Sequence, residues 1–272
     1  MRRILGSVSD LRPNLKSYVP SSGFRLVGTQ GLKLWLKAND PSTLTITSSP
    51  KVDAWLDKSP SALSFVQSTA SLKPESGNTI NGKNVVYPDG VDDVLQYLGT
   101  PFTGTKGYFA AVVRIPTSVP ASNGNLLAFG NAGISTSYFA PIRYDFQAGQ
   151  TWFGFVTNTG GTLRNCYAST TPIAANTTYL VEAESDDSTL TMRINNLAQT
   201  LTYYAGTNVG TWAGDIASLS NVTVGDLNIS IGAANGRAYL AEIVGLDGVN
   251  PSNAWKSALR RYLANEWAIT LA

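Results

Sequence analysis

The sequence predicts an all-β fold in which two antiparallel sheets pack face to face as a sandwich, followed by one C-terminal helix. Apolar and polar residues alternate in many short stretches, which is typical of half-buried strands. Dipeptides such as Asn81-Gly82 and Asp89-Gly90 separate these stretches and favour tight turns. No fixed-period repeat is present, which argues against a solenoid or a propeller. The pattern indicates a jelly-roll or sandwich domain.

We expect residues 1–30 to form an extended N-terminal arm and residues 31–272 to form the sandwich domain. The arm contains Pro13 and Pro20 and shows no clear periodicity. It carries five basic residues and one acidic residue, a net charge of +4, whereas the whole chain has a net charge of +2. A basic arm on a slightly acidic body can contact an acidic partner, or it can be a solvated terminus.

The first strand is expected at residues 32–37, where leucines alternate with Lys33, Trp35 and Lys37. Further strands are expected at 62–67, 84–88, 94–98, 107–114, 125–129, 137–146, 151–157, 179–184, 189–195, 198–204, 228–232 and 238–246. Residues 251–267 break this pattern because their apolar side chains recur at helical spacing. Ser252 or Asn253 can cap the start of this helix.

The composition excludes several kinds of chemistry. Hydrophobic residues make up 43% of the chain, which is enough for a packed core rather than disorder. The chain has no histidine, so a Ser-His-Asp system and a histidine-ligated zinc are excluded. Its single cysteine cannot form an intrachain disulfide. The sequence lacks a basic stripe with interleaved aromatic residues, so nucleic-acid binding is not expected. It also lacks a stretch of about 20 apolar residues, so a membrane span is not expected. No cofactor is expected.

Four segments, taken in order, resemble a known family. They are LKLWLKANDP at 32–41, VDAWLDKSPSALSFVQSTASLKP at 52–74, INGKNVVYPDGVDDVLQY at 80–97 and YLAEIVGLDGVNPSNAWKSALRRYLANEWAI at 239–269. Together they resemble concanavalin A-like (lectin/glucanase, laminin-G-like) domains of bacterial and phage proteins. The resemblance implies a concanavalin A-like jelly-roll sandwich with a closing helix. It does not select a function, because this fold serves glycan binders, glycosidases, adhesion modules and virion components.

Glycosidases of the family that this chain resembles carry a glutamate pair on one strand, in an ExDxxE arrangement. The nearest match is Glu182 and Glu184, which share a strand face because side chains alternate. The third acid of that motif is missing, and the family pattern implies a solvent-facing strand at this point. We therefore assign no catalytic residue and expect a protein that is not an enzyme.

Asp89, Asp92 and Asp93 form the densest group of acids. Carboxylates this close in sequence are a weak candidate for a Ca²⁺ site. The alternative, which we favour, is a tight turn in which Asp and Gly satisfy backbone donors.

Glycan binding requires exposed aromatic rings beside polar side chains on a sheet or on its rim loops. Four aromatic residues are candidates for this role: Trp152, Tyr203, Tyr204 and Trp212. The alternative, which we favour for each of them, is burial in the core.

We expect a non-catalytic structural protein of a phage virion, either a capsid decoration (cement) protein or a fibre or spike subunit. It would be made in the host cytoplasm without a signal peptide, because the N-terminus lacks an apolar signal region. The arm would bind other virion proteins of the capsid or tail, and copies of itself, through Arg2, Arg3, Ile4, Leu5, Leu11, Arg12, Leu15 and Tyr18. The alternative is a carbohydrate-recognition module that binds a receptor glycan, and a glycosidase is the third possibility.

Overall fold

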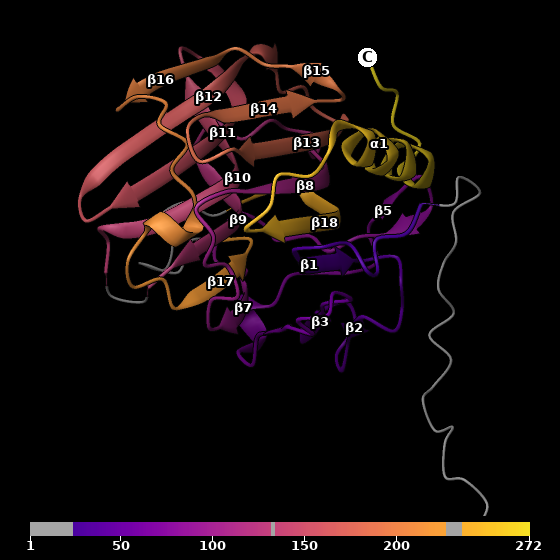
Figure 1. Ribbon diagram of the computed structural model, residues 1–272. Helices are drawn as coiled ribbons and strands as arrows, with labels where there is room; N and C mark the ends of the chain where they lie inside the picture. The colour runs from indigo at the N-terminus through magenta and orange to yellow at the C-terminus, as the bar shows by residue number, and fades with distance from the viewer. Residues whose placement is uncertain (1–23, 132–133, 227–235) are drawn as a thin grey trace, which may run out of the picture.

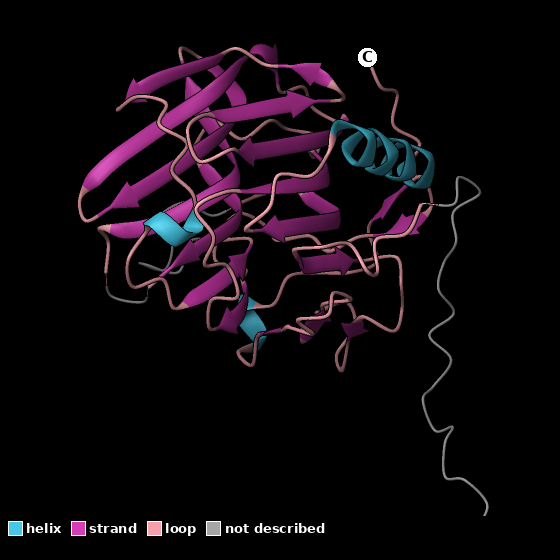
Figure 2. Cartoon of the chain, viewed as in Figure 1, coloured by secondary structure: helices cyan, strands magenta, loops and turns pink. Residues whose placement is uncertain are grey.

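The computed structural model describes residues 24–131, 134–226 and 236–272. Two large antiparallel sheets face each other, and helix α1 (Asn253–Trp267) lies against the outer side of one of them (Figure 1, Figure 2). The predicted sandwich with a C-terminal helix is therefore confirmed. Most of the expected N-terminal arm, residues 1–23, lies outside the described residues.

The six-stranded sheet supports the helix. Its strands in spatial order are β1 (Leu32–Lys37), β18 (Tyr239–Asp247), β8 (Gly107–Arg114), β13 (Thr178–Ser185), β14 (Leu190–Ile194) and β15 (Leu197–Ala198). The central strands are buried on both faces, since one face packs on the second sheet and the other on the helix. This explains why the sequence of β8, GYFAAVVR, is almost continuously apolar rather than alternating.

The ten-stranded sheet carries the longest strands. In spatial order they are β16 (Leu201–Ala205), β12 (Thr162–Pro172), β11 (Gln150–Thr159), β10 (Ser137–Gln147), β9 (Gly124–Gly130), β17 (Asn221–Val224), β7 (Leu95–Leu98), β4 (Ser64–Val66), β3 (Ala54–Leu56) and β2 (Leu44–Thr45). A small hairpin of β5 (Thr79–Ile80) and β6 (Lys83–Asn84) forms a separate two-stranded sheet.

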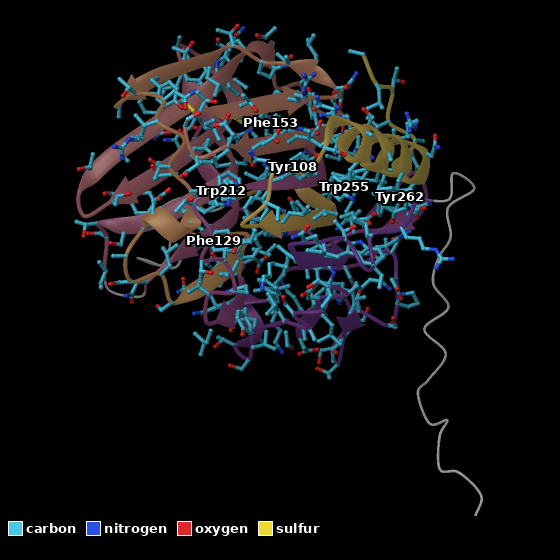
Figure 3. All side chains as sticks on the ribbon, in the orientation of Figure 1. Tyr108, Phe129, Phe153, Trp212, Trp255 and Tyr262 are labelled. Atoms are coloured by element: carbon cyan, nitrogen blue, oxygen red, sulfur yellow. The ribbon has the colours of Figure 1, made fainter. Side chains whose placement is uncertain are left out.

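The core between the two sheets is rich in aromatic rings. Trp212 and Phe129 are fully buried there and appear between the sheets in Figure 3. The ring of Phe109 on β8 stacks on Trp212 with a centroid distance of 5.3 Å, and Phe129 lies 5.7 Å from the same Phe109 ring. These contacts join strands of opposite sheets into one core.

A second apolar layer lies between α1 and the six-stranded sheet. Leu259 and Leu263 are both 0% exposed in this layer, as the helical spacing predicted. Ser252 caps the helix, since its Oγ accepts the Trp255 N–H at 3.2 Å, and Ala268 ends it in a left-handed conformation with φ of 53°. Among the described residues no helix combines the length and apolar character needed to cross a membrane.

The predicted strand at 198–204 is in fact two strands in different sheets. Ala198 ends β15 in the six-stranded sheet, and Leu201 begins β16 in the ten-stranded sheet, so the chain crosses between the sheets at Gln199 and Thr200. Strand β12 was not predicted, because its core-facing residues include only small side chains such as Cys166 and Ala168. The strand expected at 228–232 lies outside the described residues.

Candidate functional site

A group of polar and aromatic side chains lies on the outer face of the ten-stranded sheet, where β10, β11, β12 and β16 are neighbours (Figure 1). Side chains alternate between the two faces of a strand. Tyr144, Phe153 and Cys166 therefore point into the core, while the residues next to them point outward. The register places Asp145 opposite Trp152, and Gly154 opposite both Arg143 and Tyr167.

An ion pair occupies the centre of this face. Arg143 Nη2 lies 2.6 Å from Asp145 Oδ1, and the side chains are 7% and 0% exposed. The Tyr204 hydroxyl on β16 also donates a hydrogen bond to Asp145 Oδ1, at 2.9 Å. Burial raises the pKa of Asp145, while Arg143 and Tyr204 act to lower it.

Gly154 makes room for this carboxylate. A Cβ atom at position 154 would lie 1.9 Å from Asp145 Oδ2 and 3.0 Å from the carbonyl oxygen of Cys166. The side chain of Asp145 thus lies across β11 at the one residue without a side chain of its own. No larger residue fits at this position while the carboxylate stays in place.

Three aromatic rings lie over the ion pair, and we call Trp152, Tyr167 and Tyr204 the aromatic row. The ring centroids of Trp152 and Tyr167 are 5.7 Å apart, and those of Tyr167 and Tyr204 are 6.3 Å apart. Tyr204 is 43% exposed, whereas the other two rings are half-buried. The row presents aromatic surface to solvent directly above a buried charge pair.

Several polar atoms of this cluster are buried and have no hydrogen-bond partner among the residues that the structure describes. They are Arg143 Nε, Asp145 Oδ2, Trp152 Nε1 and Asn165 Oδ1. Leaving a buried polar group unpaired costs about 1–3 kcal/mol, and more for a charged group. The described residues contain sixteen such atoms, and these four gather on one face, where water or a ligand can satisfy them.

Two of the four predicted aromatic candidates, Trp152 and Tyr204, belong to this site. Tyr203, the neighbour of Tyr204, pairs with Cys166 and packs partly against the core. Trp212 is fully buried between Phe109 and Phe139, so the prediction that it binds a glycan is wrong.

Three residues of this site, Tyr167, Arg143 and Asp145, were not predicted from the sequence. Arg143 and Asp145 are charged residues two positions apart within an apolar strand, which is the only local signal of their shared face. Their position beneath Trp152 and Tyr204 depends on the pairing of four strands, which no local pattern specifies.

The two strand glutamates considered for catalysis lie on the other sheet and beneath α1. Glu182 is 2% exposed, accepts the Tyr108 hydroxyl at 2.6 Å, and pairs with Arg260 Nε at 2.8 Å. Glu184 pairs with Lys256 at 2.7 Å. The expectation of a solvent-facing strand is corrected here, because the helix covers it. Both carboxylates hold the helix to the sheet.

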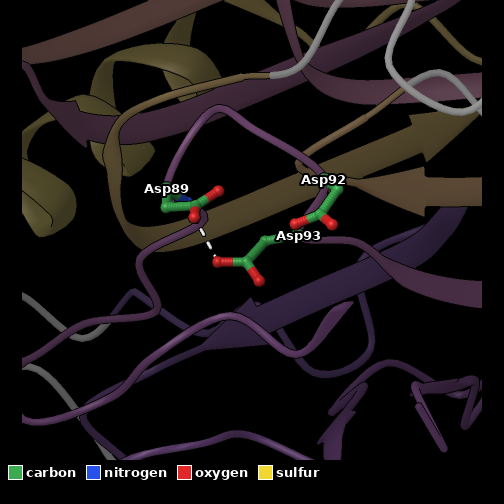
Figure 4. A group of neighbouring side chains, drawn as sticks. All are labelled: Asp89, Asp92 and Asp93. Atoms are coloured by element: carbon green, nitrogen blue, oxygen red, sulfur yellow. Dashed lines mark hydrogen bonds between the residues drawn. The ribbon is translucent and has the colours of Figure 1, made fainter. Parts of the chain in front are cut away.

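Asp89, Asp92 and Asp93 come together at the turn before β7 (Figure 4), with one carboxylate oxygen from each within 4.8 Å of the others. The hydrogen bonds of this segment are those expected of a tight turn, in which Asp side chains accept backbone N–H groups. Asp89 Oδ1 accepts the Val91 N–H at 2.8 Å, and Asp93 Oδ2 accepts the Asp89 N–H at 3.1 Å. Lys51 Nζ lies 4.0 Å from the other oxygen of Asp93, so this carboxylate already faces a positive charge.

Comparison with known proteins adds the following. No protein-family model and no curated protein matches the sequence. Trypanosoma rangeli sialidase in complex with sialic acid shares the fold with a TM-score of 0.54 and 14% identity, over 92% of this chain and 36% of the sialidase. Domain 4 of AbnA, a GH43 extracellular arabinanase from Geobacillus stearothermophilus, in complex with arabinotriose, has a TM-score of 0.53 and 8% identity, over 83% of this chain and 97% of that domain.

The chain therefore spans about a third of the sialidase's length and matches the arabinanase domain almost from end to end. At these identities the likeness shows the fold alone. It agrees with the β-sandwich that the family resemblance implied, and it gives no support to a phage context.

The prediction of a phage virion structural protein is wrong by this comparison. The solved structures that share the fold are a sialidase and an arabinanase domain, each in complex with a saccharide, and neither is a capsid, fibre or spike protein. The alternative prediction, carbohydrate recognition, agrees better with them. The residues that were expected to bind virion partners, from Arg2 to Tyr18, lie outside the described residues.

Proposed function

We propose that this chain is a carbohydrate-binding domain and that the aromatic row, with the Arg143–Asp145 pair beneath it, is its binding surface. The observation that carries the proposal is the group of four buried polar atoms without partners under three aromatic rings. A sugar ring has an apolar C–H face and a rim of hydroxyl groups. It can therefore pack on an aromatic ring and exchange hydrogen bonds with polar atoms beside that ring.

The cluster provides complementary partners for such hydroxyls. Asp145 Oδ2 and Asn165 Oδ1 are acceptors, while Arg143 Nε and Trp152 Nε1 are donors. Hydrogen bonds to charged groups contribute about 1.5–3 kcal/mol each, more than neutral ones. Binding would thus satisfy atoms that the free protein leaves unpaired.

Tyr204 controls access to the ion pair. Asp145 is fully buried and Tyr204 is the most exposed ring above it. Asp145 Oδ2 is buried, so a sugar hydroxyl reaches it only after neighbouring side chains move, and we expect Tyr204, which is bonded to Asp145 Oδ1, to turn outward. An exposed side chain changes rotamer within nanoseconds, so this step does not limit association.

We propose binding rather than hydrolysis. Retaining and inverting glycosidases both place two carboxyl groups about 5–10 Å apart around the bond that they cleave. The cluster as defined contains one carboxylate, Asp145, and both strand glutamates are paired beneath α1. The saccharides named with the two structural neighbours, sialic acid and arabinotriose, support a saccharide as the ligand class.

A glycan array tests the function. The purified chain is applied to an array that contains sialylated, arabinose-based and neutral oligosaccharides, and each glycan that binds is then incubated with the chain and analysed by chromatography. We expect selective binding and no released sugar. Absence of binding to every glycan would contradict a carbohydrate-binding function, and released sugar would show an enzyme.

A further inference from the structure

Two adjoining hollows lie beside α1 and the six-stranded sheet, and the larger one extends to Leu201 and Tyr203 of β16, at the edge of the ten-stranded sheet. They have volumes of about 390 and 750 Å³ and share Glu184, Thr191, Asn253 and Lys256. Figure 1 shows α1 next to β13 and β14, and residues of these strands, among them Glu184, Thr191 and Arg193, line the hollows. We call the two hollows together the helix groove.

The larger hollow has the size and the polarity of a small-ligand site. Pockets of about 300–1,000 Å³ are typical of such sites. Its polar lining includes Asn196, Gln199 and Asn253, and Leu190 and Leu201 form an apolar part. Gln199 Oε1 is buried and has no hydrogen-bond partner in the described part of the chain, so it is an acceptor available to a ligand hydroxyl.

The charges of the larger hollow favour an anion. Three cations, Arg193, Lys256 and Arg260, and one carboxylate, Glu184, line it. Lys256 is neutralised by Glu184, and Arg260 by Glu182 below the floor. Arg193 therefore supplies the net positive charge.

Arg193 has donors to spare. Its Nη1 donates to the carbonyl oxygen of Asn196 at 2.8 Å. Among the described residues this is the hydrogen bond that the Arg193 side chain makes. A guanidinium carries five N–H donors and binds carboxylates in a two-pronged geometry. In the smaller hollow the exposed Asp186 adds negative charge, so an anionic group is favoured only at the Arg193 end.

We propose that the helix groove is a second ligand site, which takes a carboxylated sugar. Arg193 holds its carboxylate, and Gln199 Oε1 accepts from a hydroxyl. That the ligand is a sugar rests on the proposed function. That it carries a carboxylate rests only on the charges of the helix groove.

Matched probes test this site. Trigalacturonic acid is compared with its methyl ester, and 3′-sialyllactose with lactose, by calorimetric titration at low and high salt. We expect at least one acid to bind at least about tenfold more tightly than its neutral counterpart, and to weaken as salt rises. Arg193→Gln should remove that preference, while the control Lys106→Gln, at a half-exposed loop residue outside the groove, should keep it.

Trp152→Ala separates the two sites, because it changes the aromatic row and leaves the helix groove intact. Unchanged binding of the acid by Trp152→Ala, together with its loss in Arg193→Gln, supports the groove even if the array experiment fails. Equal affinity for acid and neutral probe in both pairs would overturn the proposal. So would acid binding that Arg193→Gln leaves unaltered in a variant with the wild-type melting temperature.

Discussion

Trp267 donates its indole N–H to Oε2 of Glu242 at 2.9 Å, which ties the last turn of α1 to the middle of β18. The other oxygen, Oε1, accepts the indole N–H of Trp35 at 2.7 Å and the hydroxyl of Tyr262 at 2.8 Å. Glu242 is 0% exposed. The first and last segments of the family resemblance thus meet at one buried carboxylate, and they fix the helix rather than bind a ligand.

Replacing this carboxylate should destabilise the fold strongly. Glu242→Gln keeps one acceptor oxygen but places an amide N–H₂ against an N–H or O–H donor, so a buried donor is left unpaired. We expect a loss of about 3 kcal/mol in the free energy of unfolding, measured by urea denaturation. The control Glu75→Gln, at a half-exposed pair with Lys51 at 3.5 Å, should stay within about 0.5 kcal/mol. Similar losses in both variants would contradict this role of Glu242.

The apolar contact of α1 is tested at Leu263, which is 0% exposed. Leu263→Ala leaves a cavity between the helix and the sheet and should cost about 2–5 kcal/mol. Arg261→Ala, on the exposed side of the same helix turn, should change stability by less than about 0.5 kcal/mol. If the urea midpoints of wild type and Leu263→Ala agree, the helix does not dock as described.

Asp93 should make stability depend on pH. Burial raises its pKa from 3.8 to about 6, with further contributions from Asp89 and Asp92. The native state therefore binds more protons than the unfolded state between about pH 4 and pH 6, so this residue lowers stability as pH rises through that window. Asp93→Asn should be more stable than wild type by about 1–3 kcal/mol at pH 7.5, and about equally stable at pH 4.

Urea denaturation at the two pH values, in EDTA, measures this difference. Repeating the pH 7.5 experiment with calcium chloride separates the turn interpretation from a metal site. Stabilisation of wild type but not of Asp93→Asn by calcium would show that the three aspartates bind the ion, and the turn interpretation would then be wrong.

The sequence predicted the elements whose burial follows directly from local pattern. Strand β8 was predicted with its observed bounds, and α1 within two residues, since a continuous apolar run and a helical stripe are both local signals. Strand β12 was missed because small side chains such as Cys166 and Ala168 fill its core face. Its burial is set by its neighbours β11 and β16, not by its own hydrophobicity.

The proposed binding surface was predicted only in part. Residue type alone identified Trp152 and Tyr204, but it also selected Trp212, which the core requires. The ion pair of Arg143 with Asp145 lies against Gly154, and this contact depends on the register between β10 and β11. The pair could therefore not be predicted from either strand alone. Long-range pairing is the information that local patterns lack.

Gly154 should be essential to the binding surface. Gly154→Ala places a methyl group where Asp145 Oδ2 lies, so the carboxylate must move and its bond from Tyr204 must break or lengthen. We expect at least about tenfold weaker binding of any glycan that the array selects, with a stability loss of about 1–3 kcal/mol. Unchanged affinity in a folded Gly154→Ala protein would show that the position of Asp145 does not matter for binding.

The dissociation constant of an array-selected glycan for wild type, Trp152→Ala and Tyr138→Ala tests the binding surface most directly. Tyr138 is a half-buried aromatic residue on the same strand as Asp145, about 23 Å away along that strand. We expect Trp152→Ala to weaken binding at least about tenfold by calorimetric titration, and Tyr138→Ala to stay within about twofold of wild type. Equal dissociation constants for wild type and a folded Trp152→Ala protein would contradict the aromatic row as the carbohydrate-binding surface.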